Sequence, residues 1–272
     1  MSMPVALLDD RAMIAVSGPE ARPFLQGLIT NDIEKLSSEG PIYAALLTPQ
    51  GKILFDFLIS EGDGSLLLDC AHASREHLAK RLSAYRLRAK VTIEPRNRLA
   101  VVASWDDADI SGASAFGDPR LAELGMRAVC ARAELPDDLL SVSAYHDRRL
   151  SLGVPEGLDF GSDHMFALDA DLAELHGVSF DKGCFIGQEL TARMKHRGTA
   201  RKRLVPVFAA SALPPPRTPV TAGAQEIGEI ASTHGSRGFS VLRLDRLAEA
   251  DPRTIEAAGV PVTIERPAWL FS

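Results

Sequence analysis

The chain is poor in cysteine and has no long apolar run, and both features limit the class of protein to which it can belong. Its 272 residues include three cysteines, Cys70, Cys130 and Cys184, without a CxxC spacing. This count argues against a disulfide framework or a structural zinc site, so we expect reduced thiols and no metal site. No apolar stretch approaches the roughly 18 residues that a membrane helix needs, and residues 1–10 lack a signal-peptide pattern. We therefore predict a cytoplasmic protein that does not bind membranes.

Positive charge is also in the minority, and aromatic residues make up 6% of the chain. The formal net charge of -6 argues against general attraction to nucleic acid, so any site for a polyanion has to be local. Hydrophobic residues make up 46% of the chain and charged residues 24%, which is typical of a globular protein with a full core.

Helix and strand patterns alternate along the first 203 residues. Two apolar runs, 43–47 and 52–60, flank Thr48-Pro49-Gln50-Gly51, which predicts a hairpin. Ser17 is expected to cap a helix that ends near Thr30. A further helix is predicted over 74–88 and another within 136–150, and further strands are predicted over 65–70, 91–94, 98–104 and 126–130. This order favours α+β modules with antiparallel sheets, covered on one face by helices, over a parallel wound sheet.

The last quarter of the chain has a different composition. Four prolines between residues 214 and 219 mark a rigid loop. The runs 226–233, 237–246 and 260–265 are short and β-like, as in a small barrel. We predict two domains, an α+β region over 1–203 and a β-barrel over 204–272.

A cysteine lies just ahead of a predicted helix. Gly187 is placed to begin that helix, in which Glu189 and Arg193 form an i,i+4 pair. Cys184 precedes its N-terminus, and Lys182 is two residues away. Unpaired helix N–H groups and a neighbouring cation favour the thiolate, which makes a cysteine reactive or metal-binding. The alternative is that Cys184 is one more small packing residue.

The residues around this cysteine form a longer motif. The string KGCFIGQE at 182–189, followed by TAR at 191–193, resembles the signature of the YgfZ-type folate-binding proteins, relatives of the glycine-cleavage T protein. Further matches to the same family lie at 24–27, 30–32, 50–52 with Asp56, 152–155 and 228–232. The resemblance implies an α+β fold: a T-protein-like ring of two interleaved N-terminal α+β modules and a small C-terminal β-barrel around a central hole that admits folate.

The resemblance also implies a function and a set of site residues. The expected function is that of an accessory factor that binds tetrahydrofolate or a derivative and helps iron–sulfur enzymes mature, with iron–sulfur carrier or client proteins as partners. Cys184 and Asp56 are the expected catalytic residues, and Cys184 is also a candidate contact to a cluster. One cysteine cannot hold a cluster, which normally takes four protein ligands, so a partner or a second copy would supply the others. The expected folate contacts are Asn31, Asp32, Asp56, Asp169, Lys182, Gly183, Gln188, Glu189 and Arg193.

Two positions depart from the pattern of the related aminomethyltransferases. Those enzymes carry paired acidic residues where this chain has Phe55 and Asp56, which counts against one-carbon transfer, because a carboxylate acts on folate nitrogens only at close range. Asp169 stands where relatives often have glutamate, so it either keeps the acidic contact to a pterin with a shorter reach or loses that contact. The alternative for Asp56 is a solvent-facing residue on a half-exposed strand.

Two other functions fit parts of the sequence. The first is a folate-dependent aminomethyl or one-carbon transferase. The second is an RNA-directed role that supports tRNA modification, resting on one basic cluster, although such a run is usually a solvated face and no aromatic residues interleave it. The cluster consists of Lys195, His196, Arg197, Arg201, Lys202 and Arg203.

Overall fold

The computed structural model describes residues 4–38, 40–106, 108, 110, 114–197 and 201–271. The chain divides into two compact units, each made of several segments. Unit 1 comprises Met1–Leu47, Leu54–Arg148 and Leu175–Ile186, and unit 2 comprises Thr48–Ile53, Arg149–Glu174 and Gly187–Ser272. The predicted boundary between residues 203 and 204 separates the barrel from all that precedes it, and it stays a prediction.

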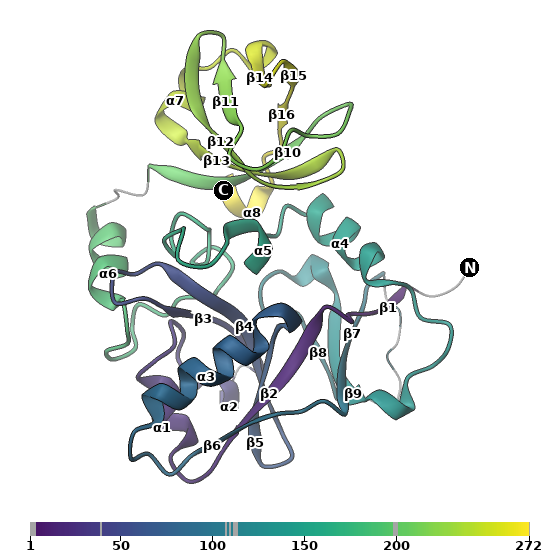
Figure 1. The fold of residues 1–272 in the computed structure, drawn as a ribbon, viewed down its shortest axis with the longest axis vertical. Helices are drawn as coiled ribbons and strands as arrows, with labels where there is room; N and C mark the ends of the chain where they lie inside the picture. The colour runs from purple at the N-terminus through teal and green to yellow at the C-terminus, as the bar shows by residue number, and fades with distance from the viewer. Residues whose placement is uncertain are drawn as a thin grey trace. The chain divides into compact units, whose positions relative to one another are not determined.

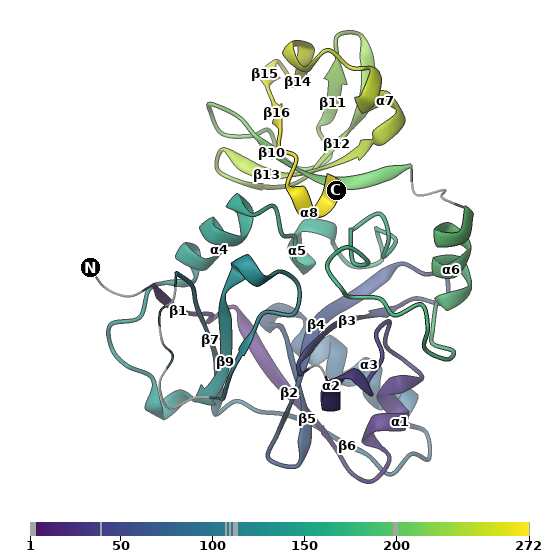
Figure 2. The same ribbon diagram turned by 180° about the vertical axis from the view of Figure 1, so that it is seen from behind.

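The larger sheet of unit 1 has five strands in the order β3-β4-β5-β2-β6. Strand β2 pairs antiparallel with β5 and β6, and β4 pairs antiparallel with β5. Helix α3 (Arg75–Arg86) covers one face of this sheet and buries Leu78 and Leu82 against it (Figures 1 and 2). The strands are β2 (Arg11–Ser17), β3 (Ile42–Leu47), β4 (Ile53–Gly62), β5 (Ser65–Ala71) and β6 (Thr92–Pro95).

The predicted hairpin is confirmed, whereas the predicted helix cap is wrong. The Gly51 N–H donates to the Thr48 carbonyl oxygen at 2.9 Å, and Gly51 has a φ of 81°, a value that favours glycine. Ser17 ends strand β2, and the following helix, α1 (Ala21–Gln26), is preceded by Glu20 without a side-chain cap. The apolar run before Ser17 continues the sheet up to that residue, so the helix starts later than its pattern indicates. A short helix, α2 (Lys35–Ser38), follows.

The second sheet of unit 1 has the strand order β1-β7-β9-β8. Its strands pair antiparallel, as the sequence predicts. They are β1 (Val5–Leu7), β7 (Leu99–Ser104), β8 (Ser114–Gly117) and β9 (Met126–Ala131). The helix predicted within residues 136–150 is present as α4 (Val142–Ser151). Short 3-10 turns cover His72–Ser74, Ala122–Leu124 and Arg132–Glu134.

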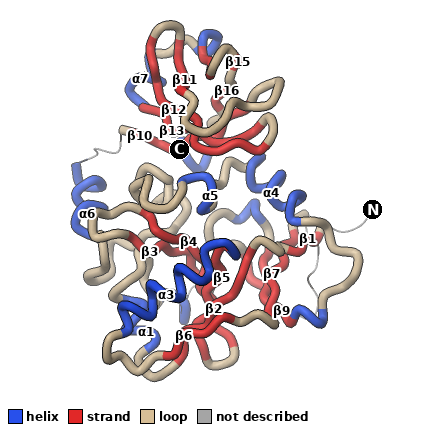
Figure 3. The backbone as a smooth tube through the Cα atoms, in the orientation of Figure 1, coloured by secondary structure: helices blue, strands red, loops and turns tan. Residues whose placement is uncertain are grey.

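Unit 2 is built mainly on a strand-rich C-terminal region, and Figure 3 draws its strands, like all others, in red. Seven strands follow the order β15-β14-β11-β12-β13-β10-β16 around a core that includes Val205, Ile230 and Leu242. The strands are β10 (Lys202–Phe208), β11 (Pro219–Ala222), β12 (Gln225–His234), β13 (Arg237–Arg243), β14 (Ile255–Ala257), β15 (Val260–Pro261) and β16 (Thr263–Ile264). The strand-rich prediction for this region is therefore confirmed.

The helices of unit 2 are short. They are α5 (Gly157–Phe160), α6 (Gln188–Arg197), α7 (Leu244–Glu249), α8 (Ala268–Phe271) and a 3-10 turn at Pro252–Thr254. Among all the helices that the structure describes in either unit, none is long and apolar enough to cross a membrane.

Candidate functional site: a thiol loop and a buried carboxylate

The segment that carries Cys184, residues 176–186, is called the thiol loop here and is held in unit 1 by the side chain of Lys182. The Lys182 ammonium group donates to the backbone carbonyl oxygens of Gln26 at 2.7 Å, Ile29 at 2.7 Å and Asn31 at 2.8 Å. It also lies 5.1 Å from the ring centroid of Phe185, within the range of a cation–π contact. These contacts use all three N–H donors of the ammonium group, so Lys182 holds the thiol loop against the end of α1.

Burial changes the acidity of this ammonium group. Lys182 is 7% exposed, and its burial lowers the pKa of the ammonium to about 8, while the nearby Asp32 carboxylate opposes that shift. Lys182 thus places a cation where water is scarce, and the three backbone carbonyl oxygens replace the hydration that the ammonium group loses.

Three further hydrogen bonds tie the start of the thiol loop to the same short segment. The Thr30 hydroxyl donates to the Gly177 carbonyl oxygen at 2.6 Å, and the Ser179 N–H donates to the Thr30 carbonyl oxygen at 3.0 Å. The Asn31 side-chain amide donates to the His176 carbonyl oxygen at 2.8 Å. The loop from residue 176 to Lys182 is therefore anchored at several points. Its anchors, Thr30 and Asn31, lie roughly 150 residues earlier in the chain.

The three cysteines differ sharply in their surroundings. Cys184 is exposed, and so is the adjoining Gly183, whereas Cys70 is buried in the core of unit 1. Burial raises the pKa of the Cys70 thiol to about 12 and also raises that of Cys130. Cys130 is half-buried, so Cys184 is the most exposed of the three thiols, and it is not a buried packing residue.

Asn31 and Asp32 have internal roles. The Asn31 amide donates to the Tyr43 carbonyl oxygen at 2.8 Å, and its side-chain oxygen accepts from the Asp32 N–H at 2.8 Å. The Asp32 carboxylate accepts from the side-chain amide of Gln26 at 2.9 Å and from the Glu34 N–H at 3.1 Å. Both side chains therefore shape the turn that receives Lys182.

Asp56 is buried on β4. It is 5% exposed, which excludes the alternative of a solvent-facing residue, and its carboxylate accepts from the Tyr43 hydroxyl at 3.2 Å. Phe55, its neighbour on the other face of the strand, packs against the core under α3. Tyr43 therefore connects two predicted site residues, because its carbonyl accepts from Asn31 and its hydroxyl donates to Asp56.

The remaining predicted residues lie in unit 2. Asp169 is half-buried, and burial raises the pKa of its carboxyl to about 6 against the opposing charges of Arg203 and Lys202. Gln188 begins α6, and Glu189 and Arg193 form the predicted i,i+4 ion pair at 2.7 Å. That pair is largely exposed to solvent.

Sequence reasoning missed a buried carboxylate in unit 2. Asp171 is fully buried, both of its carboxylate oxygens lack a hydrogen bond, and its nearest cation is Arg203, whose Nε lies 3.6 Å away. Arg203 also donates to the Leu168 carbonyl and pairs with Glu174 at 2.9 Å. Of the predicted basic cluster, Arg203 is thus engaged inside unit 2. Residues 198–200 and the Arg197 side chain lie outside the described part of the chain.

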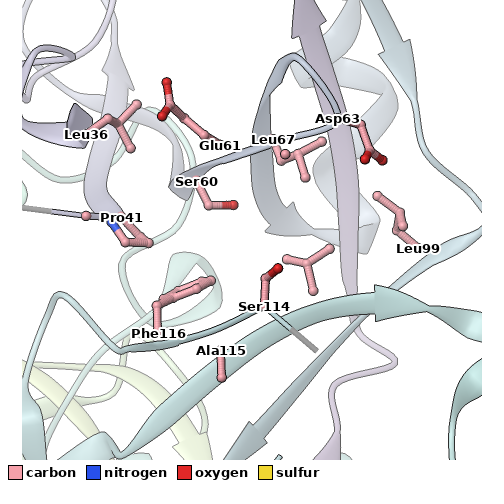
Figure 4. Close-up of a pocket in the computed structure, with 13 residues that line it drawn as sticks. Leu36, Pro41, Ser60, Glu61, Asp63, Leu67, Leu99, Ser114, Ala115 and Phe116 are labelled. Atoms are coloured by element: carbon pink, nitrogen blue, oxygen red, sulfur yellow. The ribbon is translucent and has the colours of Figure 1, made fainter. Parts of the chain in front are cut away.

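Unit 1 also has a hollow that is separate from the thiol loop. It has a volume of about 330 Å³ between α2 and strands β4, β5, β7, β8 and β9, and Glu61 and Asp63 are among its lining residues (Figure 4). The predicted site residues are absent from its lining. In the parts of the chain that the structure describes, no group of three or more His, Cys, Asp and Glu side chains is placed to hold a metal ion.

The fold defines the class of protein. A crystal structure of the glycine cleavage system aminomethyltransferase T from Bartonella henselae superposes with a TM-score of 0.74 at 16% identity, covering 98% of this chain and 86% of that one. Residues 201–272 match the family described as the C-terminal β-barrel domain of CAF17. The predicted T-protein-like α+β fold with a C-terminal barrel is therefore confirmed, while the central hole stays a prediction.

Sequence relatives define the family more narrowly. The mitochondrial iron–sulfur cluster assembly factor IBA57 of Homo sapiens is 36% identical over 96% of this chain and 84% of its own length. The mouse protein of the same name is 35% identical with the same coverage. The chain belongs to the IBA57 family of iron–sulfur cluster assembly factors. The prediction of a cytoplasmic protein is wrong by this comparison, because these relatives are named as mitochondrial.

Proposed function

We propose that this chain is an accessory factor of iron–sulfur cluster assembly that presents the Cys184 thiol to a carrier or client protein. Membership of the IBA57 family supports the assembly role. The observation that carries the proposal is the exposed thiol on a loop that Lys182 fixes through three hydrogen bonds. One thiolate supplies one ligand to iron, so the partner supplies the others. Expression in a strain without its own relative should restore iron–sulfur enzyme activity.

A second part of the proposal is that the chain is of the YgfZ type and binds tetrahydrofolate or a derivative. A reduced pterin offers several N–H donors, and carboxylates accept hydrogen bonds from such donors. Asp56 in unit 1 and Asp169 in unit 2 have the matching chemistry. Asn31 and Asp32 would act indirectly by shaping unit 1, and Gly183, Gln188, Glu189 and Arg193 are further proposed contacts from the motif.

Calorimetry with 5-formyltetrahydrofolate tests this second part. A ligand present at 100 times its dissociation constant stabilises the folded state by about 2.7 kcal/mol, which a thermal shift detects easily. Absence of both heat and thermal shift at millimolar folate would remove folate from the proposal and leave the assembly role standing.

Aminomethyl transfer is the second candidate function, favoured by the T-protein-like fold and by the retained Asp56. Phe55 opposes it, because this half-buried side chain packs against the core at the position where the enzymes have a second acidic residue. We therefore expect no formation of methylenetetrahydrofolate from aminomethyl substrates. Turnover of about 1 to 1,000 per second, the usual enzyme range, would restore the transferase function. An RNA-directed role stays a sequence prediction.

A further inference from the structure

Unit 2 has a hollow of its own, lined by residues of α5, of the loop after it and of strands β12 and β13. This unit 2 hollow has a volume of about 260 Å³, and its lining includes Leu158, Phe160, His164 and Ile230. Phe160 and Ile230 are buried, whereas Leu158 is 71% exposed. A single exposed leucine is ordinary, but one that lines an apolar hollow offers a contact to an apolar side chain of another molecule.

One charged residue of this hollow has a backbone conformation that favours glycine. Arg217 lines the hollow and has a φ of 71°, in the left-handed region. The Thr218 N–H donates to the Pro215 carbonyl oxygen at 3.2 Å, which closes a four-residue turn with Pro216 in second place and Arg217 in third. Proline in second place and a positive φ in third are typical of a type II turn, where glycine is the usual third residue. The chain thus has an arginine where glycine would be free of strain.

This turn is fixed to the barrel by its own backbone. The Arg217 N–H donates to the Ile230 carbonyl oxygen at 2.7 Å, and the Ile230 N–H donates to the Thr218 carbonyl oxygen at 2.9 Å. The Thr218 hydroxyl adds a bond to the Pro215 carbonyl oxygen at 2.7 Å. Strained residues persist only where the surrounding structure holds them, and they are frequent at binding sites. The backbone therefore holds Arg217 at the hollow despite the strain.

The charges at the unit 2 hollow favour one carboxylate beside Arg217. Arg217 is exposed, and among the described residues its guanidinium has no hydrogen bond or ion pair. Asp159, also in the lining, is already compensated, because it accepts from Arg149 at 2.7 Å and from Ser232 at 2.5 Å. Glu229 is exposed and lines the same hollow, so it opposes a second carboxylate. A guanidinium binds a carboxylate through two parallel hydrogen bonds, so the site suits a single acidic group and not an acidic run.

We propose that the unit 2 hollow is a docking site for an extended segment of a partner protein in which one carboxylate adjoins one apolar side chain. The apolar side chain packs against Leu158 and Ile230, and the carboxylate pairs with Arg217. A volume of about 260 Å³ is below that of pockets for drug-sized ligands, so it suits one side chain with its flanking backbone. The site uses neither the Cys184 thiol nor folate, and it therefore goes beyond the function proposed above.

The test uses the full chain and two blocked dipeptides, acetyl-Asp-Leu-amide and acetyl-Asn-Leu-amide, which differ in one charge. Their dissociation constants are measured from the amide NMR signals of Ile230 and Ala231. Arg217→Gly removes the side chain and supplies the residue that prefers this φ, so the turn is kept. Leu158→Ser removes the apolar contact. Leu87→Ser is the matched control, because Leu87 is 88% exposed and belongs to unit 1.

We expect the wild type to bind the aspartate peptide about fivefold more tightly than the asparagine peptide, as for a well-formed exposed ion pair. Arg217→Gly should bind the two peptides equally. Leu158→Ser should weaken the binding of both, and Leu87→Ser should change neither. Equal binding of the two peptides by the wild type, or a preference for aspartate that survives in Arg217→Gly, would overturn the proposal. Unshifted signals of Ile230 and Ala231 at millimolar peptide would overturn it as well.

Discussion

The ammonium group of Lys182 lies 2.7 Å from the carbonyl oxygen of Ile29, although 153 residues separate the two along the chain. Together with its bonds to Gln26 and Asn31, this contact makes one side chain the main anchor of the Cys184 loop. The lysine of the KGC motif thus supports the thiol by binding backbone carbonyl oxygens of a distant segment, which fixes the loop that carries Cys184.

Replacing this anchor should loosen the loop and weaken unit 1. Lys182→Met removes three charge-assisted hydrogen bonds and leaves buried carbonyl oxygens without a donor, so we expect a loss of about 2 to 4 kcal/mol in the free energy of unfolding. Urea titration measures that loss. Lys80→Met on the exposed face of α3 is the matched control, with an expected change within about 0.5 kcal/mol. Equal effects of the two substitutions would contradict the anchoring role.

The three thiols should react at very different rates. Alkylation across pH 6 to 9, with each site read by mass spectrometry, should label Cys184 first because it is exposed. Cys70 should label last, because it is buried and its pKa is raised to about 12. Labelling of Cys70 or Cys130 ahead of Cys184 in the folded protein would contradict this order.

The buried Asp171 should make stability depend on pH. Burial raises the pKa of its carboxyl well above the usual value, so its contribution to stability is complete below about pH 4 and is lost as pH rises through the folded pKa. Asp171→Asn keeps the shape, and asparagine tolerates the φ of 59°. We therefore expect this variant to be more stable than the wild type at pH 8, by about 1 kcal/mol or more, with the difference shrinking toward pH 4.

Thermal melts at several pH values measure this effect. Asp63→Asn is the matched control, because Asp63 has a similar φ of 51° but is exposed to solvent. The control should follow the wild type at every pH. An Asp171→Asn protein that is less stable than the wild type at pH 8 would show that the pairing with Arg203 outweighs the cost of burial.

Local patterns and long-range contacts were not equally predictable from the sequence. The hairpin around Gly51 and the helix α6 follow from turn residues and spacing, and both are present. The partners of Lys182 were not predictable, because they are backbone carbonyls about 150 residues away. Tyr43 was missed for a related reason, since its strand is apolar throughout and gives no sign that one hydroxyl meets Asp56.

The burial of several charged residues was equally unpredictable from the sequence. Arg120, Arg127 and Asp118 belong to segments without a motif, and charged residues usually lie at the surface. Asp171 lies two residues beyond Asp169. The family pattern includes the position of Asp169 and gives no sign of a second, buried carboxylate at Asp171. Burial of a charge depends on which distant partners meet it, and a single sequence does not specify those partners.

The central claim is that the exposed Cys184 thiol serves iron–sulfur cluster assembly, and one comparison tests it most directly. In cells that lack their own relative of this chain, iron–sulfur enzyme activity is measured with the wild type, with Cys184→Ala and with Cys130→Ala as the matched control. Equal protein levels are verified by immunoblot. We expect the wild type and Cys130→Ala to restore activity and Cys184→Ala to leave it near the level of cells without the protein. Full restoration by Cys184→Ala would contradict the claim and reduce the thiol loop to an architectural feature.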